Sequence, residues 1–167
     1  MFDLPESFNE NEWFVIVSMI VLSICFIKTP RMMCREWIAS IFLWFANLGL
    51  GVDILLGIDY PFDFYQIMDT PKLELFDILV YFVNYPLYGY FFAYIMYKWI
   101  VRKDVLLLFV LIWCGLTAAL EAFSVHFHVF TYLHGWTLGR SFLVYLVIYS
   151  FSAAVLKGFQ RIWQNST

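Results

Sequence analysis

Three ionisable residues, Asp53, Glu121 and Arg140, lie inside long apolar stretches and are the clearest candidates for chemistry in this sequence. In hydrocarbon such a group costs on the order of a few kcal/mol, so it normally faces protein or water and finds a partner. Because two acids share one arginine, one carboxyl is expected to be neutral, since desolvation and a like-charged neighbour both favour that form. Such a carboxyl can exchange a proton, or bind a cationic or hydroxylated ligand.

Two interpretations of these three groups stay open. In the first, Arg140 bridges Asp53 or Glu121 and only holds the helices together. In the second, the surplus carboxylate is functional. At 1.5 Å per residue, the three groups lie roughly 6 to 13 Å below one membrane boundary, so all of them belong to the same half of the bilayer.

Helical spacing brings further polar residues toward the same region. Small residues, Gly49 and Gly57, share a helix face with Asp53 and let a neighbouring helix approach closely. A polar stripe descends the next predicted helix at steps of four, three and four: Asp77, Tyr81, Asn84 and Tyr88. Pro86 interrupts the backbone hydrogen bonds of that helix and frees the carbonyl of Phe82.

The following predicted helix carries Glu121 and His128 seven positions apart, so the two lie on one face, with Ser124 between them. His126 points elsewhere. The sequence therefore predicts one polar cluster, structural or ligand-binding, made of Asp53, Asp77, Asn84, Glu121, His128 and Arg140.

The histidines do not fit a metal site. His126 and His128 diverge by about 200° on a helix, whereas metalloprotease helices place their ligands at i and i+4. We therefore predict no metal and no cofactor. No Gly-x-Ser-x-Gly elbow is present, and no serine lies in a recognisable catalytic motif, so no catalytic residue is assigned.

The composition shows which elements must position these groups. Of 167 residues, 63% are hydrophobic and 14% charged, whereas soluble domains have about 45 to 50% apolar and about 25% charged residues. Spanning the bilayer takes roughly 20 helical residues. We expect an all-α, polytopic membrane protein with a single transmembrane domain, residues 1–167, and about five helices at 13–27, 37–58, 76–100, 105–130 and 136–156. No basic stripe suits nucleic acid.

Charge is segregated between alternate connections. Eight of the ten basic residues fall on one side of a five-span protein: Lys28, Arg31, Arg35, Lys98, Arg102, Lys103, Lys157 and Arg161. The other side receives the acidic amino terminus and the acidic loop 59–75. By the positive-inside rule, the amino terminus lies outside and the carboxyl terminus in the cytoplasm of a cell-membrane, multi-pass protein.

Aromatic residues are concentrated near the predicted cluster. The third helix is dense in tyrosine and phenylalanine between Tyr81 and Tyr97, which is typical of a packing surface and would also suit a wall for an apolar ligand. The loop 59–75 begins with an aromatic stretch suited to the headgroup zone. That loop would cap whatever the helices enclose.

Three short segments resemble a known family. They are Gly51-Val52-Asp53-Ile54-Leu55-Leu56-Gly57, then Tyr81-Phe82-Val83-Asn84-Tyr85-Pro86, then Glu121 with an aromatic loop that ends Gly135-Trp136. Together they resemble an uncharacterised family of small multi-pass membrane proteins common in spore-forming Gram-positive bacteria. The resemblance runs from about residue 37 to the end and implies the same topology in a bacterial cell membrane. It lends no activity, and it singles out Asp53, Asn84, Pro86 and Glu121.

Three functions are compatible with the sequence. The leading hypothesis is a non-enzymatic bundle that binds a lipid-like ligand or a partner helix from the outer leaflet. The alternatives are a small oligomeric transporter or proton-coupled carrier, and a membrane enzyme acting on a lipid or isoprenoid. That enzyme would use Glu121 or Asp53 as general acid and His128 as base. The expected partners are membrane lipids and a second copy or a partner membrane protein.

Overall fold

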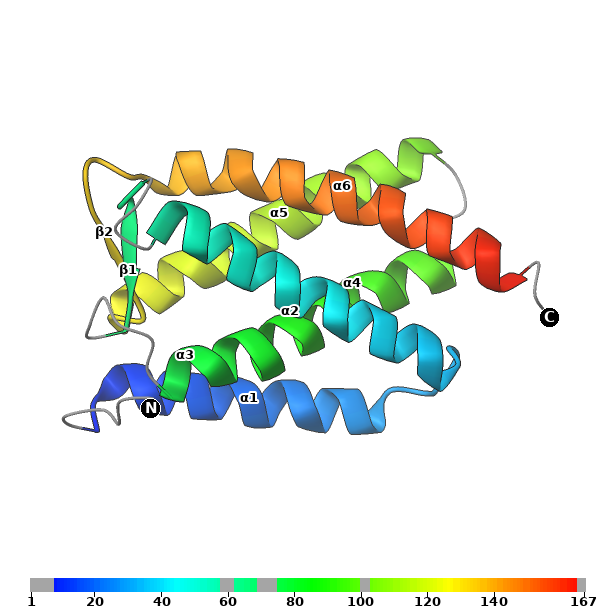
Figure 1. Cartoon of the computed structure of the whole chain (residues 1–167), viewed down its shortest axis with the longest axis horizontal. Helices are drawn as coiled ribbons and strands as arrows, with labels where there is room; N and C mark the ends of the chain where they lie inside the picture. Colours follow the sequence, from blue (N-terminus) through cyan, green and yellow to red (C-terminus); the bar gives the residue numbers. More distant parts are fainter. Residues whose placement is uncertain (1–7, 58–61, 69–74, 100–102, 165–167) are drawn as a thin grey trace.

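Five helical segments in the described part of the chain are long and apolar enough to cross a membrane, and they form one bundle (Figure 1). A computed structural model describes residues 8–57, 62–68, 75–99 and 103–164. The segments are α1 (Glu10–Lys28), α2 (Arg35–Gly57), a third span built from α3, η1 and α4, then α5 (Lys103–His126) and α6 (Leu138–Gln164). The chain is a multi-pass integral membrane protein, and the predicted five-helix bundle is confirmed.

Successive helices run in opposite directions through the bundle. Figure 1 shows that α1, α3 and α6 begin at the end where a small β-ribbon lies, while α2 and α5 end there. The two closest helix pairs are α5 with α6 and α2 with α4. The start of α1 and the end of α6 therefore lie at opposite ends of the bundle.

The third span changes its helical geometry in the middle. It comprises α3 (Leu75–Leu79), the π-helix η1 (Val80–Asn84) and α4 (Tyr85–Trp99). The Tyr85 amide donates to the Val80 carbonyl, five positions back, and Pro86 supplies no amide of its own. The wide turn lets the span continue past the proline. Asn84 and Tyr88 of the predicted stripe both line the central cavity of the bundle.

Helices α2 and α4 approach closely through glycine. A Cβ added at Gly49 would lie 2.1 Å from the ring of Tyr85, and one added at Gly89 would lie 2.1 Å from the ring of Phe45. Each helix thus has a glycine against which an aromatic ring of the other helix packs. Of the two glycines predicted beside Asp53, Gly49 serves this close helix contact, whereas a Cβ at Gly57 would meet Tyr65 of the β-ribbon.

A two-stranded antiparallel ribbon is the main feature that the all-α prediction missed. Strand β1 (Tyr65–Ile67) pairs with β2 (Phe130–Tyr132), with Tyr65 opposite Tyr132. The predicted fourth helix extended to residue 130, but α5 ends at His126, and His128 then takes a left-handed backbone with φ 57°. Aromatic and β-branched residues favour the extended strand that follows.

The other helix boundaries differ by smaller amounts. Helix α6 continues to Gln164 instead of ending at residue 156, so Lys157 and Arg161 belong to the helix. The predicted ends at Ile58 and Ile100, and most of the loop 59–75, lie outside the described residues.

Two apolar clusters fill the described part of the bundle. The larger includes Ile41, Phe92 and Leu156, which are fully buried. The smaller lies at the ribbon end and includes Tyr65 and Trp136. Members of both clusters line the cavity that holds the two acids.

The glycine contact predicts an asymmetric mutational response along α2. Gly49→Ala should lower the free energy of unfolding by about 1 to 3 kcal/mol, because the new methyl group overpacks against Tyr85. Gly51→Ala is the matched control, since nothing lies within 4 Å of its Cβ, and it should leave stability unchanged or raise it by up to about 1 kcal/mol through the higher helix propensity of alanine. Thermal unfolding followed by circular dichroism in mild detergent measures both. Equal effects of the two substitutions would contradict this helix contact.

Candidate functional site

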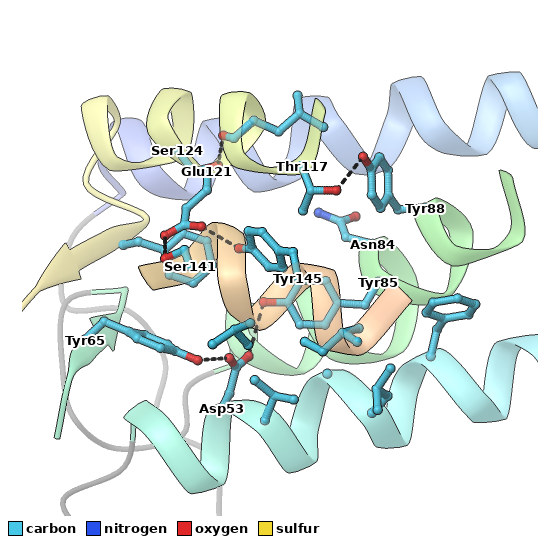
Figure 2. A pocket seen from close by; sticks show the side chains of 18 of the residues that line it. Asp53, Tyr65, Asn84, Tyr85, Tyr88, Thr117, Glu121, Ser124, Ser141 and Tyr145 are labelled. Carbon is cyan, nitrogen blue, oxygen red and sulfur yellow. Dashed lines mark hydrogen bonds between the residues drawn. The ribbon is translucent and has the colours of Figure 1, made fainter. Parts of the chain in front are cut away.

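A cavity of about 240 Å³ lies within the bundle and receives side chains from all five spans (Figure 2). Its walls are mostly apolar and aromatic, from residues such as Phe14, Phe45, Leu48 and Val144. Its polar lining comes from each of the five spans and from β1: Ser18, Asp53, Tyr65, Asn84, Tyr85, Tyr88, Thr117, Glu121, Ser124, Ser141, Tyr145 and Tyr149.

Asp53 is buried in this cavity with 5% of its surface exposed. Its two carboxylate oxygens accept hydrogen bonds from different elements. The Tyr65 hydroxyl on β1 donates to Oδ1, and the Tyr85 hydroxyl on α4 donates to Oδ2 at 3.1 Å. Burial and the neighbouring Asp53 raise the pKa of Tyr65, so this phenol stays protonated and remains a donor.

Glu121 is buried to a similar degree, with 7% exposed, and accepts three hydrogen bonds. The hydroxyls of Tyr132 and Ser141 each donate to Oε1 at 2.6 Å, and the hydroxyl of Tyr145 donates to Oε2 at 2.5 Å. The Trp136 indole donates to the Ser141 oxygen at 2.8 Å and fixes its orientation. Burial and the hydrogen bond to Glu121 raise the pKa of Tyr132.

The ribbon connects the two acids. Tyr65 and Tyr132 are directly opposite each other in its register, so they form one cross-strand pair. One hydroxyl of this pair reaches Asp53 on α2, and the other reaches Glu121 on α5. A single tertiary element thus supplies a donor to each buried carboxyl.

A second group of hydroxyls lies farther along the cavity. The Thr117 hydroxyl, one turn before Glu121 on α5, lies 3.0 Å from the hydroxyl of Tyr88 and 3.3 Å from that of Tyr149. The Asn84 amide donates to Ser18 on α1 at 2.9 Å. The buried Oδ1 atom of Asn84 accepts no hydrogen bond from the described residues.

The six residues of the predicted polar cluster separate into two groups. Asp53, Asn84 and Glu121 line the cavity. Asp77 is buried on α3 but is not among the lining residues. His128 is exposed in the turn after α5, so it does not share a helix face with Glu121 as the spacing had suggested.

The ion pair of Arg140 with Asp53 or Glu121, one of the two interpretations left open by the sequence, does not form among the described residues. Arg140 is exposed in the first turn of α6, and its guanidinium donates to the Gly135 carbonyl at 3.0 Å. The next residue, Ser141, occupies the buried face and reaches Glu121 instead. Because α6 begins only at Leu138, Arg140 is close enough to the helix end to leave the bundle interior.

Sequence reasoning missed the hydroxyl donors. Ser141, Tyr145 and Tyr149 recur every four positions on α6, so their common face was detectable by the same spacing argument used for the third span. Tyr65 and Tyr132 gave no such signal, because their pairing is set by the ribbon and not by local periodicity.

The chemistry available at the site is that of carboxyl groups and hydroxyls. Among the described residues, the cavity lining includes two acids and no lysine, arginine or histidine. Across the described residues, no group of three or more His, Cys, Asp and Glu side chains could hold a metal ion. The arrangement can bind a hydrogen-bond donor or a cation, or exchange a proton.

Known proteins do not assign a role to this geometry. No protein family model, no curated protein and no solved structure matches the chain. The functional argument therefore starts from the cavity and its hydrogen bonds.

The position of Tyr145 predicts a specific loss of stability. Tyr145→Phe should cost about 1 to 3 kcal/mol, because it removes a donor from a buried carboxyl. Tyr94→Phe is the matched control: the buried Tyr94 hydroxyl has no hydrogen-bond partner among the described residues. That substitution should be neutral or slightly stabilising.

Arg140→Gln tests the corrected role of the arginine in the same unfolding assay. It should change stability by no more than about 0.5 kcal/mol, as expected of an exposed side chain. If Arg140→Gln instead lowered the free energy of unfolding by several kcal/mol, the interpretation in which Arg140 pairs with a buried acid would be correct.

Proposed function

We propose that the protein binds a lipid-like, amphipathic ligand in this cavity and does not transform it. The observation that supports this function is that the cavity combines a polar part with an apolar part. Two buried acids and their hydroxyl donors lie beside walls that are mostly apolar and aromatic. Ligand sites commonly combine an apolar lining with a few placed polar groups. A ligand that matches has a small polar head and an apolar body.

The volume limits the size of the bound part. Pockets that enclose drug-sized molecules measure roughly 300 to 1,000 Å³, and this cavity measures about 240 Å³. The cavity therefore has room for the polar head of the ligand and for the first part of one apolar tail. Because the cavity lies among membrane-spanning helices, the rest of the tail can extend into the surrounding lipid.

The positions of the polar side chains favour binding over catalysis. An acid–base mechanism on a lipid required His128 as the base, and His128 is exposed outside the cavity. Ser141 is the serine that contacts an acid. Its hydroxyl donates to Glu121 and accepts a hydrogen bond from the Trp136 indole. It has no neighbouring histidine or lysine to activate it as a nucleophile.

The positions of the basic residues give the protein an orientation in the membrane. Lys28, Arg31, Arg35 and Lys98 lie at the ends of helices opposite the ribbon. By the positive-inside rule that end is cytoplasmic, so the ribbon and the acids are close to the outer face of the cell membrane. The resemblance to small membrane proteins of spore-forming bacteria supports this placement, and outer-leaflet lipids are the proposed source of the ligand. A second copy or a partner membrane protein would receive the bound molecule.

Filling the cavity should displace the ligand. Val144→Phe adds volume to a lining residue of α6, whereas Val147→Phe adds the same volume to a side chain that is 70% exposed on the same helix. In native mass spectrometry of protein extracted with its own lipids, we expect a single amphipathic adduct on the wild type and on Val147→Phe. Val144→Phe should lose most of that adduct.

Thermal unfolding of the two valine variants checks that each is folded. The same adduct on Val144→Phe, or no adduct on the wild type, would contradict the proposed function.

A further inference from the structure

We infer that the head of the ligand is an ammonium group, a positively charged nitrogen that carries N–H donors, on a single apolar chain. This inference rests on the proposed function and names the chemistry of the head that the cavity accepts. Its support comes from three features of the lining: its charge, the direction of its hydrogen bonds and its aromatic walls.

In the part of the chain that the structure describes, the lining carries acids without bases. Asp53 and Glu121 are both more than nine-tenths buried and face the same cavity. The two histidines that follow Glu121, His126 and His128, are exposed, and so is Arg140, which donates to the Gly135 carbonyl. A buried carboxylate is costly unless a positive charge or several donors compensate it. A cationic head would supply the missing charge.

The hydroxyl donors at this end of the cavity are already in use. Asp53 receives hydrogens from Tyr65 and Tyr85 and has Tyr81 as a further hydrogen-bonding neighbour, while Glu121 receives hydrogens from three hydroxyls. The Ser124 hydroxyl donates to the Leu120 carbonyl. A carboxylate offers about four lone-pair sites, so acceptor capacity remains on both acids, and the Asn84 Oδ1 atom adds one more acceptor.

This imbalance selects the head group. An ammonium has three donors and no acceptor, which complements a site that offers acceptors. A phosphate or carboxylate head has the reverse character and would lie beside two acids whose hydroxyl partners already donate to them. The site therefore discriminates against the phosphate heads of ordinary phospholipids.

The walls beside the acids also suit a cation. The rings of Tyr65 and Trp136 contact each other at 6.0 Å between centroids, and both line the cavity. Aromatic faces attract an ammonium that lies within about 6 Å of the ring centroid. The same rings pack against the apolar part of the ligand.

Calorimetric titration of head groups on one tail tests the inference. The full chain, in phosphatidylcholine nanodiscs at neutral pH with empty nanodiscs as blank, is titrated with octylammonium, octan-1-ol and octyl phosphate. Octylammonium should bind about tenfold more tightly than octan-1-ol, the affinity equivalent of one hydrogen bond to a charged group. Octyl phosphate should bind more weakly than either.

Substitution of the acids should remove this preference. Asp53→Asn and Glu121→Gln keep the side-chain shape and should each bring octylammonium within about twofold of octan-1-ol, since the charged partner is lost. Asp63→Asn is the matched control, because Asp63 lies outside the cavity lining and pairs with His134 at 3.6 Å. It should keep the tenfold preference. The wild-type comparison decides the question even where one substitution prevents folding.

The outcomes separate this inference from the function on which it rests. Equal binding of octylammonium and octan-1-ol, or tighter binding of octyl phosphate, would overturn the ammonium head and leave the binding function in place. No binding of any of the three probes to folded protein would overturn both.

Discussion

A carboxyl group enclosed by membrane-spanning helices must obtain from the protein the hydrogen bonds that water would otherwise give. Here Asp53 and Glu121 obtain them from five neutral hydroxyls and not from a cation among the described residues. Neutral donors satisfy the oxygens but bring no positive charge to the site. That condition makes the cavity receptive to a proton or to a positively charged ligand.

Several departures from regular helix packing contribute to this arrangement. The π-helix before Pro86 changes which side chains of the third span share a face. Asn84 then reaches α1, while Tyr85 reaches Asp53 on α2. The absence of a side chain at Gly49 provides the space in which the Tyr85 ring lies. The ribbon adds the cross-strand pair that reaches both acids, so features distant in sequence act on one site.

The sequence was sufficient for the bundle but only partly for the site. Apolar length and charge segregation predicted five spans, because bilayer thickness and the cost of burying charge act on each segment independently. The same argument identified Asp53 and Glu121 as residues inside the membrane. One open interpretation paired Arg140 with Asp53 or Glu121, but Arg140 in the first turn of α6 is exposed, whereas the next residue, Ser141, is buried.

The remaining parts of the site depend on tertiary structure. The ribbon register that places Tyr65 opposite Tyr132 depends on strands that are more than sixty residues apart. The end of α5 at His126 depends on the same ribbon, since the chain must turn to form β2. Local periodicity contains neither fact, which is why His128 was predicted on a helix face that does not exist.

A double-mutant cycle between Asp53→Asn and Tyr65→Phe tests most directly whether the ribbon hydroxyls hold the buried acids. The free energies of unfolding of the two single variants, the double variant and the wild type are measured in one detergent. A direct hydrogen bond between these side chains predicts a coupling of about 1 to 3 kcal/mol. Additive effects, within about 0.5 kcal/mol, would show that Tyr65 does not hold Asp53 and would contradict this account of the site.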